Sequence, residues 1–452
     1  MKKGLAVLSL LMLGLFPVMA RGSKDSSAGG SSELYPAGSL IYWSTGQPNA
    51  EPRYWDSFWE RNRDIAPNVK FETEALQTMA AGQQKIAMYA LSGDRASMPD
   101  VIVLDTVGVI QMISTGLLLD NNDFFAPIAG EFIDGVLSDY TINGKIYGLP
   151  EQVRPQMLFY NDEIFKKYNI DPAMMSTFDG YLEAGRLLKQ RSNGQVFLSY
   201  VDPGSFTWRY YGRRGLMPQA NARIWDNQGN VVIGGDPGTK LALGFFDKLY
   251  SEGLLYKTTM LQPPIFEATD EGKIATFYIG AFWDEWLRRN CTGTAGKWRA
   301  MKAPVFPEVG TGGAPVANGW CLIDKKPNKY TGLIRKFWYD FQANVNARNA
   351  WSAERERVKG FYCIPLSKKL VADPFWQAPS DYYGGQSFFK AESDCLGANP
   401  SLNMPLTSSD TEADAIISAE IEKYVAGEQT MAQAIANMDR ELKLKIGKAV
   451  MP

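Results

Sequence analysis

Residues Ile142–Phe165 read INGKIYGLPEQVRPQMLFYNDEIF, and the fold is best approached from this stretch. Asn143 and Gly144 tolerate a positive φ, so they predict a tight turn that reverses a short hairpin. Near the end of the stretch, Asn161 or Asp162 offers a side-chain oxygen that caps a following helix. We therefore expect a turn, then an extended segment, then a helix.

The extended segment contains Pro150 and Pro155. A proline has no N–H to donate to a neighbouring strand, so it is found at sheet edges rather than in central strands. We expect this segment to lie at a sheet edge, or to cross from one structural unit to another.

The first 20 residues have the order of an export signal. Two lysines precede an apolar run from Leu5 to Phe16, and small residues including Ala20 follow. The run is shorter than the roughly 20 residues that cross a bilayer, and a buried N-terminal helix is the alternative. We expect cleavage after Ala20 and a flexible Ser/Gly-rich leader over residues 21–37. No cysteine follows the run, so no lipid anchor is expected.

Composition narrows the function. After removal of the signal, roughly 430 residues remain, which suits two domains better than one core. The net charge is −2 with acids and bases intermixed, which disfavours nucleic acid or a membrane surface as partner. The chain has no histidine, which excludes His-based nucleophile pairs and His-ligated zinc. The cysteines lack CxxC spacing, so we expect no metal cluster. We also expect no cofactor.

From Ser39 the sequence alternates between short apolar runs and amphipathic segments. The apolar runs predict strands over Ser39–Trp43, Val69–Glu74 and Asp100–Leu104. The segments between them predict helices over Arg53–Ile65, Met79–Leu91 and Val107–Ile113. Repeated strand and helix units indicate an α/β fold with a mainly parallel sheet, whose ligands bind beyond the carboxyl ends of the strands.

A second region begins near Pro150. Its patterns predict helices over Phe159–Tyr168, Asp179–Gln190, Thr239–Ser251 and Trp283–Arg289, and a strand over Lys273–Ile279. The C-terminal part ends in an amphipathic helix with an apolar stripe of Met431, Ala434, Ile435, Met438 and Leu442.

Several phrases, in order and across nearly the whole mature chain, resemble those of one family. They are MPDVIVLD and STGLLLD, GKIYGLP followed by FYNDEIF, DEGKIATFYIGAFW, NGWCLI, GFYCIP, and GEQTMAQAIANM. The chain resembles the family 1 extracellular solute-binding proteins of ABC importers (maltose-binding-protein-like). The resemblance implies a two-lobed periplasmic binding protein of type II, each lobe a mainly parallel sheet flanked by helices, joined by a hinge of crossing segments.

In this family the strand after GKIYGLP passes between the lobes, which accounts for the prolines. The resemblance places further crossings near Ala303–Pro307 and Phe361–Pro365. The N-terminal lobe would comprise residues 38–149 and 308–361, and the C-terminal lobe residues 150–307 and 362–452. A ligand would lie between lobes that close by a hinge motion.

Sugars are bound by aromatic rings that stack on their C–H faces and by polar groups that fix their hydroxyls. Strand ends offer both types, with a core or helix-capping role as the alternative for each residue. We expect ligand contacts from Trp43, Ser44, Gln47, Gln77, Asp105, Thr106, Asn318, Gly319 and Trp320. Phe206-Thr207-Trp208 is similar to a Phe-Thr-Trp beside the family's sugar contacts, which adds Trp208 and nearby Asp202. Trp283 follows Gly280-Ala281-Phe282, where the family places a platform aromatic.

Arg154 falls, by the spacing from Pro150 to Tyr160, where the family resemblance places an acidic sugar contact. An arginine there could hold a carboxylate bidentately, which suggests an acidic sugar such as a uronate. The alternatives are that Arg154 pairs with Glu151 or Asp105, or donates to neutral hydroxyls.

The resemblance implies capture of a mono- or oligosaccharide and its delivery to the transmembrane subunits of an ABC importer, by a monomer. One rival is a secreted glycosidase-like enzyme. The adjacent acids Asp162-Glu163, Asp270-Glu271 and Asp284-Glu285 do not support it, because neighbours on a helix do not face each other. The other rival is a binding protein used for chemoreceptor sensing.

The four cysteines lie in the last third of the chain. If each pair forms within one inferred lobe, the expected disulfides are Cys321–Cys363 and Cys291–Cys395. Buried free thiols are the alternative.

Overall fold

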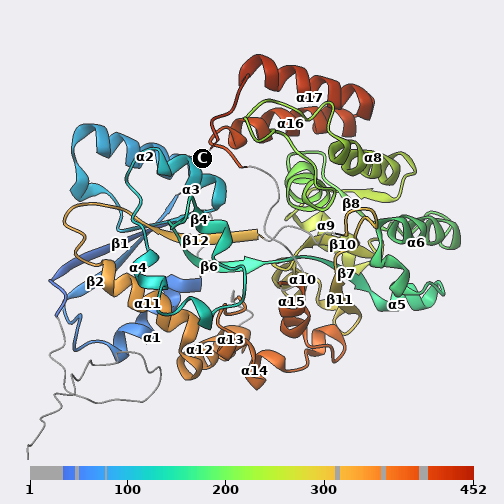
Figure 1. Ribbon diagram of the computed structural model, residues 1–452. Coiled ribbons are helices and arrows are strands. Elements are labelled where there is room, and N and C mark those ends of the chain that lie inside the picture. The colour runs from blue at the N-terminus through green and yellow to red at the C-terminus, as the bar shows by residue number, and fades with distance from the viewer. Residues whose placement is uncertain are drawn as a thin grey trace, which may run out of the picture.

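The computed structural model describes residues 34–45, 50–76, 79–310, 316–357, 363–396 and 406–451. Two lobes, each with its own central sheet and covering helices, are joined by strands that run from one to the other (Figure 1). The expected signal peptide and the leader up to residue 33 lie outside the described residues, as do Gln47 and Gln77.

The first lobe has a five-stranded sheet in the order β2-β1-β3-β12-β6. Its strands are β1 (Gly38–Thr45), β2 (Val69–Leu76), β3 (Val101–Leu104), β6 (Leu149–Arg154) and β12 (Val316–Leu322), with the hairpin β4 (Thr141–Ile142) and β5 (Lys145–Ile146) beside it. Its helices are α1 (Ala50–Arg61), α2 (Met79–Ser92), α3 (Thr106–Ile113), α4 (Asn122–Phe125), α11 (Thr331–Ala343), α12 (Val345–Arg357), α13 (Lys368–Val371) and α14 (Pro374–Gln377).

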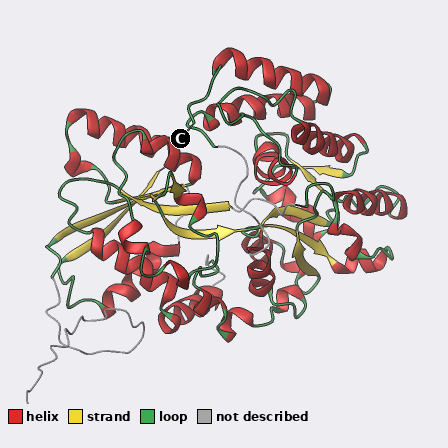
Figure 2. Ribbon diagram, in the orientation of Figure 1, coloured by secondary structure: helices red, strands yellow, loops and turns green. Residues whose placement is uncertain are grey.

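The second lobe has a three-stranded sheet in the order β10-β7-β11 and a separate strand pair, with helices around both (Figure 2). Its strands are β7 (Gln156–Asn161), β8 (Ser199–Val201), β9 (Leu255–Lys257), β10 (Thr276–Gly280) and β11 (Trp298–Lys302). Its helices are α5 (Asp162–Lys167), α6 (Phe178–Arg191), a π-helix (Thr207–Leu216), α7 (Met217–Gln219), α8 (Pro237–Ser251), α9 (Pro263–Asp270), α10 (Trp283–Asn290), α15 (Phe388–Leu396), α16 (Asp410–Val425) and α17 (Met431–Lys445).

The stretch Ile142–Phe165 forms the first crossing between the lobes, as predicted. Asn143 and Gly144 have φ values of 51° and 76° and turn β4 into β5. Strand β6, which carries Pro150, is the edge strand of the first sheet, and β7 continues it as the central strand of the second. Asn161 caps α5 by accepting a hydrogen bond from the Ile164 N–H, so the helix begins later than the predicted Phe159.

The pairing of the strands is less parallel than expected. In the first lobe β1 pairs parallel with β2 and β3, whereas β12 runs antiparallel to β3 and β6. In the second lobe β10 and β11 both run antiparallel to β7, and only β8 and β9 pair parallel. The crossings between the lobes explain part of the antiparallel pairing. Strands β6 and β7 lead from the first lobe to the second, whereas β11 and β12 lead back, so β11 runs antiparallel to β7 and β12 runs antiparallel to β6.

Two separate clusters of buried apolar side chains fill the lobes. The first includes residues from Leu40 to Val153 and from Ala317 to Phe341, and the second includes residues from Met157 to Phe306. We had expected the chain to return to the second lobe at residue 362, but the apolar side chains of 363–376 pack in the first cluster. We therefore propose that the last crossing lies between Trp376 and Tyr383, the first later residue of the second cluster.

Two other features of the described residues bear on the predictions. None of their helices combines the length and apolar character needed to cross a membrane. All four cysteines are among the described residues, and each is buried as a thiol outside any disulfide. The predicted disulfides Cys321–Cys363 and Cys291–Cys395 are therefore wrong.

Candidate functional site

Three of the four tryptophans expected to contact a ligand belong instead to the two cores. Trp43, Trp283 and Trp320 have exposed fractions of 2%, 0% and 0%. The ring of Trp283 packs 4.9 Å from the ring of Phe277, and that of Trp320 packs 5.1 Å from Phe337. Each indole therefore stabilises its lobe by burying a large apolar surface, and none forms a platform at the surface.

Asp202 and Trp208 also have structural partners. The two carboxylate oxygens of Asp202 each accept a backbone N–H at 2.6 Å, from Gly204 and Met260, which holds the loop after β8. Trp208 is 3% exposed, and its Nε1 donates to Asp414 at 2.8 Å. The expectation that their side chains contact a ligand is corrected, because both point into the second lobe.

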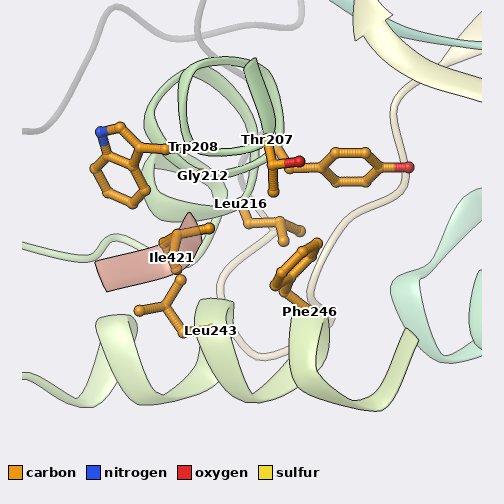
Figure 3. Close-up of a pocket in the computed structure, with 8 residues that line it drawn as sticks. Thr207, Trp208, Gly212, Leu216, Leu243, Phe246 and Ile421 are labelled. Atoms are coloured by element: carbon orange, nitrogen blue, oxygen red, sulfur yellow. The ribbon is translucent and has the colours of Figure 1, made fainter. Parts of the chain in front are cut away.

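The inner face of the π-helix lines a small apolar cavity (Figure 3). Trp208 on the π-helix, Leu243 and Phe246 on α8 and Ile421 on α16 surround it. Its volume of about 10 Å³ is at the limit for one water molecule. This cavity is too small for any sugar.

Arg154 is fully buried and already paired. Its Nε donates to Glu392 of α15, its Nη1 lies 3.4 Å from Glu285 of α10, and its Nη2 donates to the Ala281 carbonyl at 2.9 Å. Burial lowers the pKa of Arg154, but the two carboxylates outweigh burial and raise it. The expectation that Arg154 binds a carboxylate of the ligand is therefore wrong, because Arg154 is paired with acids of the protein itself.

The other predicted residues lie at the edge of the first sheet that faces the second lobe. Asp105 caps α3, with its Oδ1 accepting the Gly108 N–H at 2.9 Å, and Thr106 is half-buried as the first residue of that helix. Ser44 is buried near the carboxyl end of β1, and Asn318 is half-buried on β12. These four residues remain candidates.

Gly319 has a packing role. The pairing register of β12 and β6 shifts between Asn318 and Gly319, which is a bulge. A Cβ at Gly319 would stand 2.6 Å from the ring of Tyr140, whose hydroxyl donates to the Leu104 carbonyl at 3.2 Å. Only glycine lets this ring lie flat against the strand.

A wall of aromatic and basic side chains on the second lobe was missed by the sequence reasoning. The rings of Phe206 and Tyr210 are parallel, with centroids 5.7 Å apart, and Phe282 lies 5.3 Å from Tyr210. Phe206 and Phe282 are half-buried, whereas Tyr210 is buried between them. We call Phe206, Tyr210, Phe282 and the neighbouring arginines 209, 213 and 214 the aromatic–arginine wall.

This wall faces the first lobe. Burial lowers the pKa of Arg214, and the charge of Asp105, at the carboxyl end of β3, is among the effects that oppose this shift. The same charge acts on Arg213, whose pKa is raised against burial mainly by Asp414 and Asp410 and to a smaller extent by Asp105. At the rim, Gln111 of α3 donates to the Ser408 carbonyl at 3.2 Å and to the Thr411 hydroxyl at 2.8 Å, which belong to the segment that begins α16. The strand ends of the first sheet and the π-helix therefore form two sides of one interlobe site.

The sequence did contain a signal for this wall. Phe206 and Tyr210 are four residues apart, as are Arg209 and Arg213, so each pair shares one helical face. The segment is a π-helix, and π-helical turns occur frequently at functional sites. We expected Trp208 to contact the ligand, but its neighbours Phe206 and Tyr210 are the residues that face the interlobe side.

The fold and this interlobe site are those of a two-lobed binding protein. The chain belongs to the family of bacterial extracellular solute-binding proteins, whose model matches residues 48–330.

Two relatives of similar sequence are binding proteins for sugars. An arabinooligosaccharide-binding protein of Halalkalibacterium halodurans is 23% identical over 64% of this chain and 63% of its own length, so the match spans just under two thirds of that relative. A lactose-binding protein of Rhizobium radiobacter is 21% identical over 86% of this chain and 89% of its own.

Among solved structures, the fold is similar to an ABC transporter associated binding protein of B. animalis subsp. lactis Bl-04 in complex with β-1,6-galactobiose. The two chains are 20% identical, with a TM-score of 0.66 over 90% of this chain and 97% of that one. At this identity the similarity establishes the two-lobed fold.

Proposed function

We propose that this protein is the substrate-binding component of an ABC importer and captures a mono- or oligosaccharide between its lobes. The observation that carries the proposal is the pairing of an aromatic–arginine wall on one lobe with polar strand ends on the other. Half-buried rings offer stacking surfaces, while Asp105 and the arginines offer acceptors and donors for hydroxyls. Named relatives that bind arabinooligosaccharides and lactose support a carbohydrate ligand.

The expected partners and location follow from this role. The protein is exported with its signal removed near Ala20, works in the periplasm as a monomer, and presents its closed form to the transmembrane subunits of the importer. The family is described as extracellular, which supports export.

Turnover of the sugar is not part of the proposal. Asp284 is occupied by Arg288 at 2.8 Å and by the Tyr383 hydroxyl at 2.9 Å, and Glu285 faces Arg154. Asp162 pairs with Lys166 at 2.6 Å. Each of these acids is held by a basic or hydroxyl side chain, and the described contacts do not pair any of them with an opposing acid across the interlobe site, as glycoside hydrolysis would require.

A thermal-shift screen over neutral and acidic mono- and oligosaccharides tests the proposal. A true ligand at 100 times its Kd stabilises the protein by about 2.7 kcal/mol, which gives a clear rise in melting temperature. Hits are then confirmed by calorimetry and by chromatography of the recovered sugar, which should be unchanged. If no carbohydrate raises the melting temperature, the proposed ligand class is wrong. If the recovered sugar is cleaved, the protein is an enzyme.

A further inference from the structure

Two arginines of the aromatic–arginine wall have no carboxylate partner among the described residues. The guanidinium carbons of Arg209 and Arg214 lie 5.7 and 5.8 Å from the ring centroid of Tyr210, and no ion pair involves either of them within the described chain. Arg209 is exposed and Arg214 is half-buried. Two cationic groups therefore flank the aromatic surface and remain open to a ligand.

The carboxylates closest to this wall are already paired with its third arginine, Arg213. Arg213 lies 3.1 Å from Asp410 and 3.3 Å from Asp414. Asp410 also accepts from Trp225 Nε1 at 2.7 Å, and Asp414 accepts from Trp208 Nε1 at 2.8 Å. These hydrogen bonds hold both acids against the second lobe, so neither is free to move to Arg214.

The remaining acid near Arg214 belongs to the first lobe. Asp105 caps α3 by accepting the Gly108 N–H, and its charge acts on Arg214. Burial and the charge of Arg209 together lower the pKa of Arg214, against the opposing effects of Tyr210, Asp105 and Asp414. Arg214 is therefore a cation that gains stabilisation from an added anion.

We propose that the bound saccharide carries a carboxylate, which Arg214 binds with Arg209 beside it while the sugar ring lies against Phe206 and Phe282. This inference rests on the proposed function and adds the chemical class of the ligand. A guanidinium presents two parallel N–H groups that match the two oxygens of a carboxylate. Asp105, across the site, is an acceptor suited to a hydroxyl of the same sugar.

The experiment compares acidic sugars with neutral sugars of the same shape. Di- and trisaccharides of galacturonate, glucuronate and mannuronate are each titrated calorimetrically beside their methyl esters, together with a panel of neutral oligosaccharides. An ester keeps the ring, the linkage and the hydroxyls and removes only the charge. We expect at least one acid to bind at least tenfold more tightly than its ester.

Variants then assign the effect to the wall. In Arg214→Gln the ratio of acid to ester affinity should fall at least tenfold, and Arg214→Lys should restore only part of it because the planar fork is lost. Arg440→Gln is the matched control, because Arg440 is exposed on α17 and pairs with Glu441. This control should leave the ratio unchanged. Circular dichroism and melting temperature verify that each variant is folded.

The possible outcomes separate the two proposals. If only neutral oligosaccharides and esters bind, or if they bind as tightly as the acids, the carboxylate inference is overturned while the binding function stands. If no saccharide of either kind binds, the proposed function fails as well. If an acid binds preferentially but the preference persists in Arg214→Gln, the arginine assignment is wrong.

Discussion

At the scale of single residues, the buried group around Arg154 has the clearest electrostatic consequence. One guanidinium faces two carboxylates, so the three groups carry excess negative charge when all are ionised. Burial raises the pKa of Glu285 to about 8 and that of Glu392 to about 7, although Arg154 opposes both shifts. Glu285 makes the longer contact with Arg154, so we expect it to retain the proton.

This arrangement predicts a pH dependence of stability. A glutamate with a folded pKa above its ordinary 4.5 stabilises the fold below pH 4.5, and this contribution is lost as the pH rises through about 8. The free energy of unfolding should therefore decrease between pH 5 and pH 8. Glu285→Gln, which mimics the protonated form, should flatten that slope and gain at least about 1 kcal/mol at pH 8.

Urea unfolding at pH 5, 6, 7 and 8 measures this effect. Glu354→Gln is the control, because Glu354 is exposed and pairs with Arg357 three residues along α12. A slope in Glu285→Gln equal to that of the unmodified protein would show that Glu285 is ionised in the folded state.

The cysteines give a second prediction at this scale. Burial is the main cause that raises the pKa of Cys291 and of Cys395 to about 12, and it raises that of Cys321 as well. At pH 8 almost no reactive thiolate is present in the folded protein. A thiol reagent should therefore label less than one cysteine per native chain and four after unfolding in urea. Stoichiometric labelling of the native protein would contradict the burial of these thiols.

At the scale of elements, the outer face of the π-helix and the start of α10 carry the third prediction. Phe206→Ala and Phe282→Ala should each weaken sugar binding about tenfold with little change in stability, since both rings are half-buried. Trp283→Ala should instead destabilise the fold by about 3–5 kcal/mol, because its ring is fully buried against Phe266 and Phe277.

Calorimetry and urea unfolding of the three variants measure the two effects separately. If Trp283→Ala is stable but binds sugar poorly while both phenylalanine variants bind normally, the assignment of the site to the aromatic–arginine wall is wrong.

The same elements show why sequence patterns predicted the fold better than the site. The alternation from Ser39 to Ile113 located three strands and three helices of the first lobe, because apolar periodicity reports directly on burial. The same burial misled the choice of ligand contacts. Trp43 and Trp283 stand at or just after the carboxyl ends of strands, but a side chain on a buried strand or helix start points into the lobe as readily as out of it.

Antiparallel pairing and the last crossing were not predictable in the same way. The segment 363–376 carries apolar residues that fit either core, and only the packing of Leu366, Leu370 and Trp376 assigns it to the first lobe. The interlobe site depends on this global path, because Asp105 and Arg214 are distant in sequence and the charge of Asp105 acts on Arg214 only when the lobes are placed together.

At the scale of the whole molecule, two contacts between the lobes differ in burial and in their distance from the hinge. The Arg154 group joins β6 of the first lobe to α10 and α15 and is buried at the hinge. The hydrogen bonds of Gln111 to Ser408 and Thr411 are exposed and lie at the rim. Because rotation about a hinge moves the rim much further than the hinge itself, the Gln111 contacts are the ones that opening must break.

The last prediction follows from this difference. Gln111→Ala removes interactions that exist only when the lobes are close, so it should destabilise the closed form and leave the open form unaffected. Each hydrogen bond contributes about 0.5–1.5 kcal/mol, so loss of the two should weaken sugar affinity at least about fivefold. Small-angle scattering should show a larger radius of gyration for the ligand-free variant. Gln190→Ala, an exposed glutamine on α6, is the matched control and should change neither quantity. Equal affinities and equal radii for the two variants would mean that the rim contact does not bias closure, and that the ligand alone holds the lobes together.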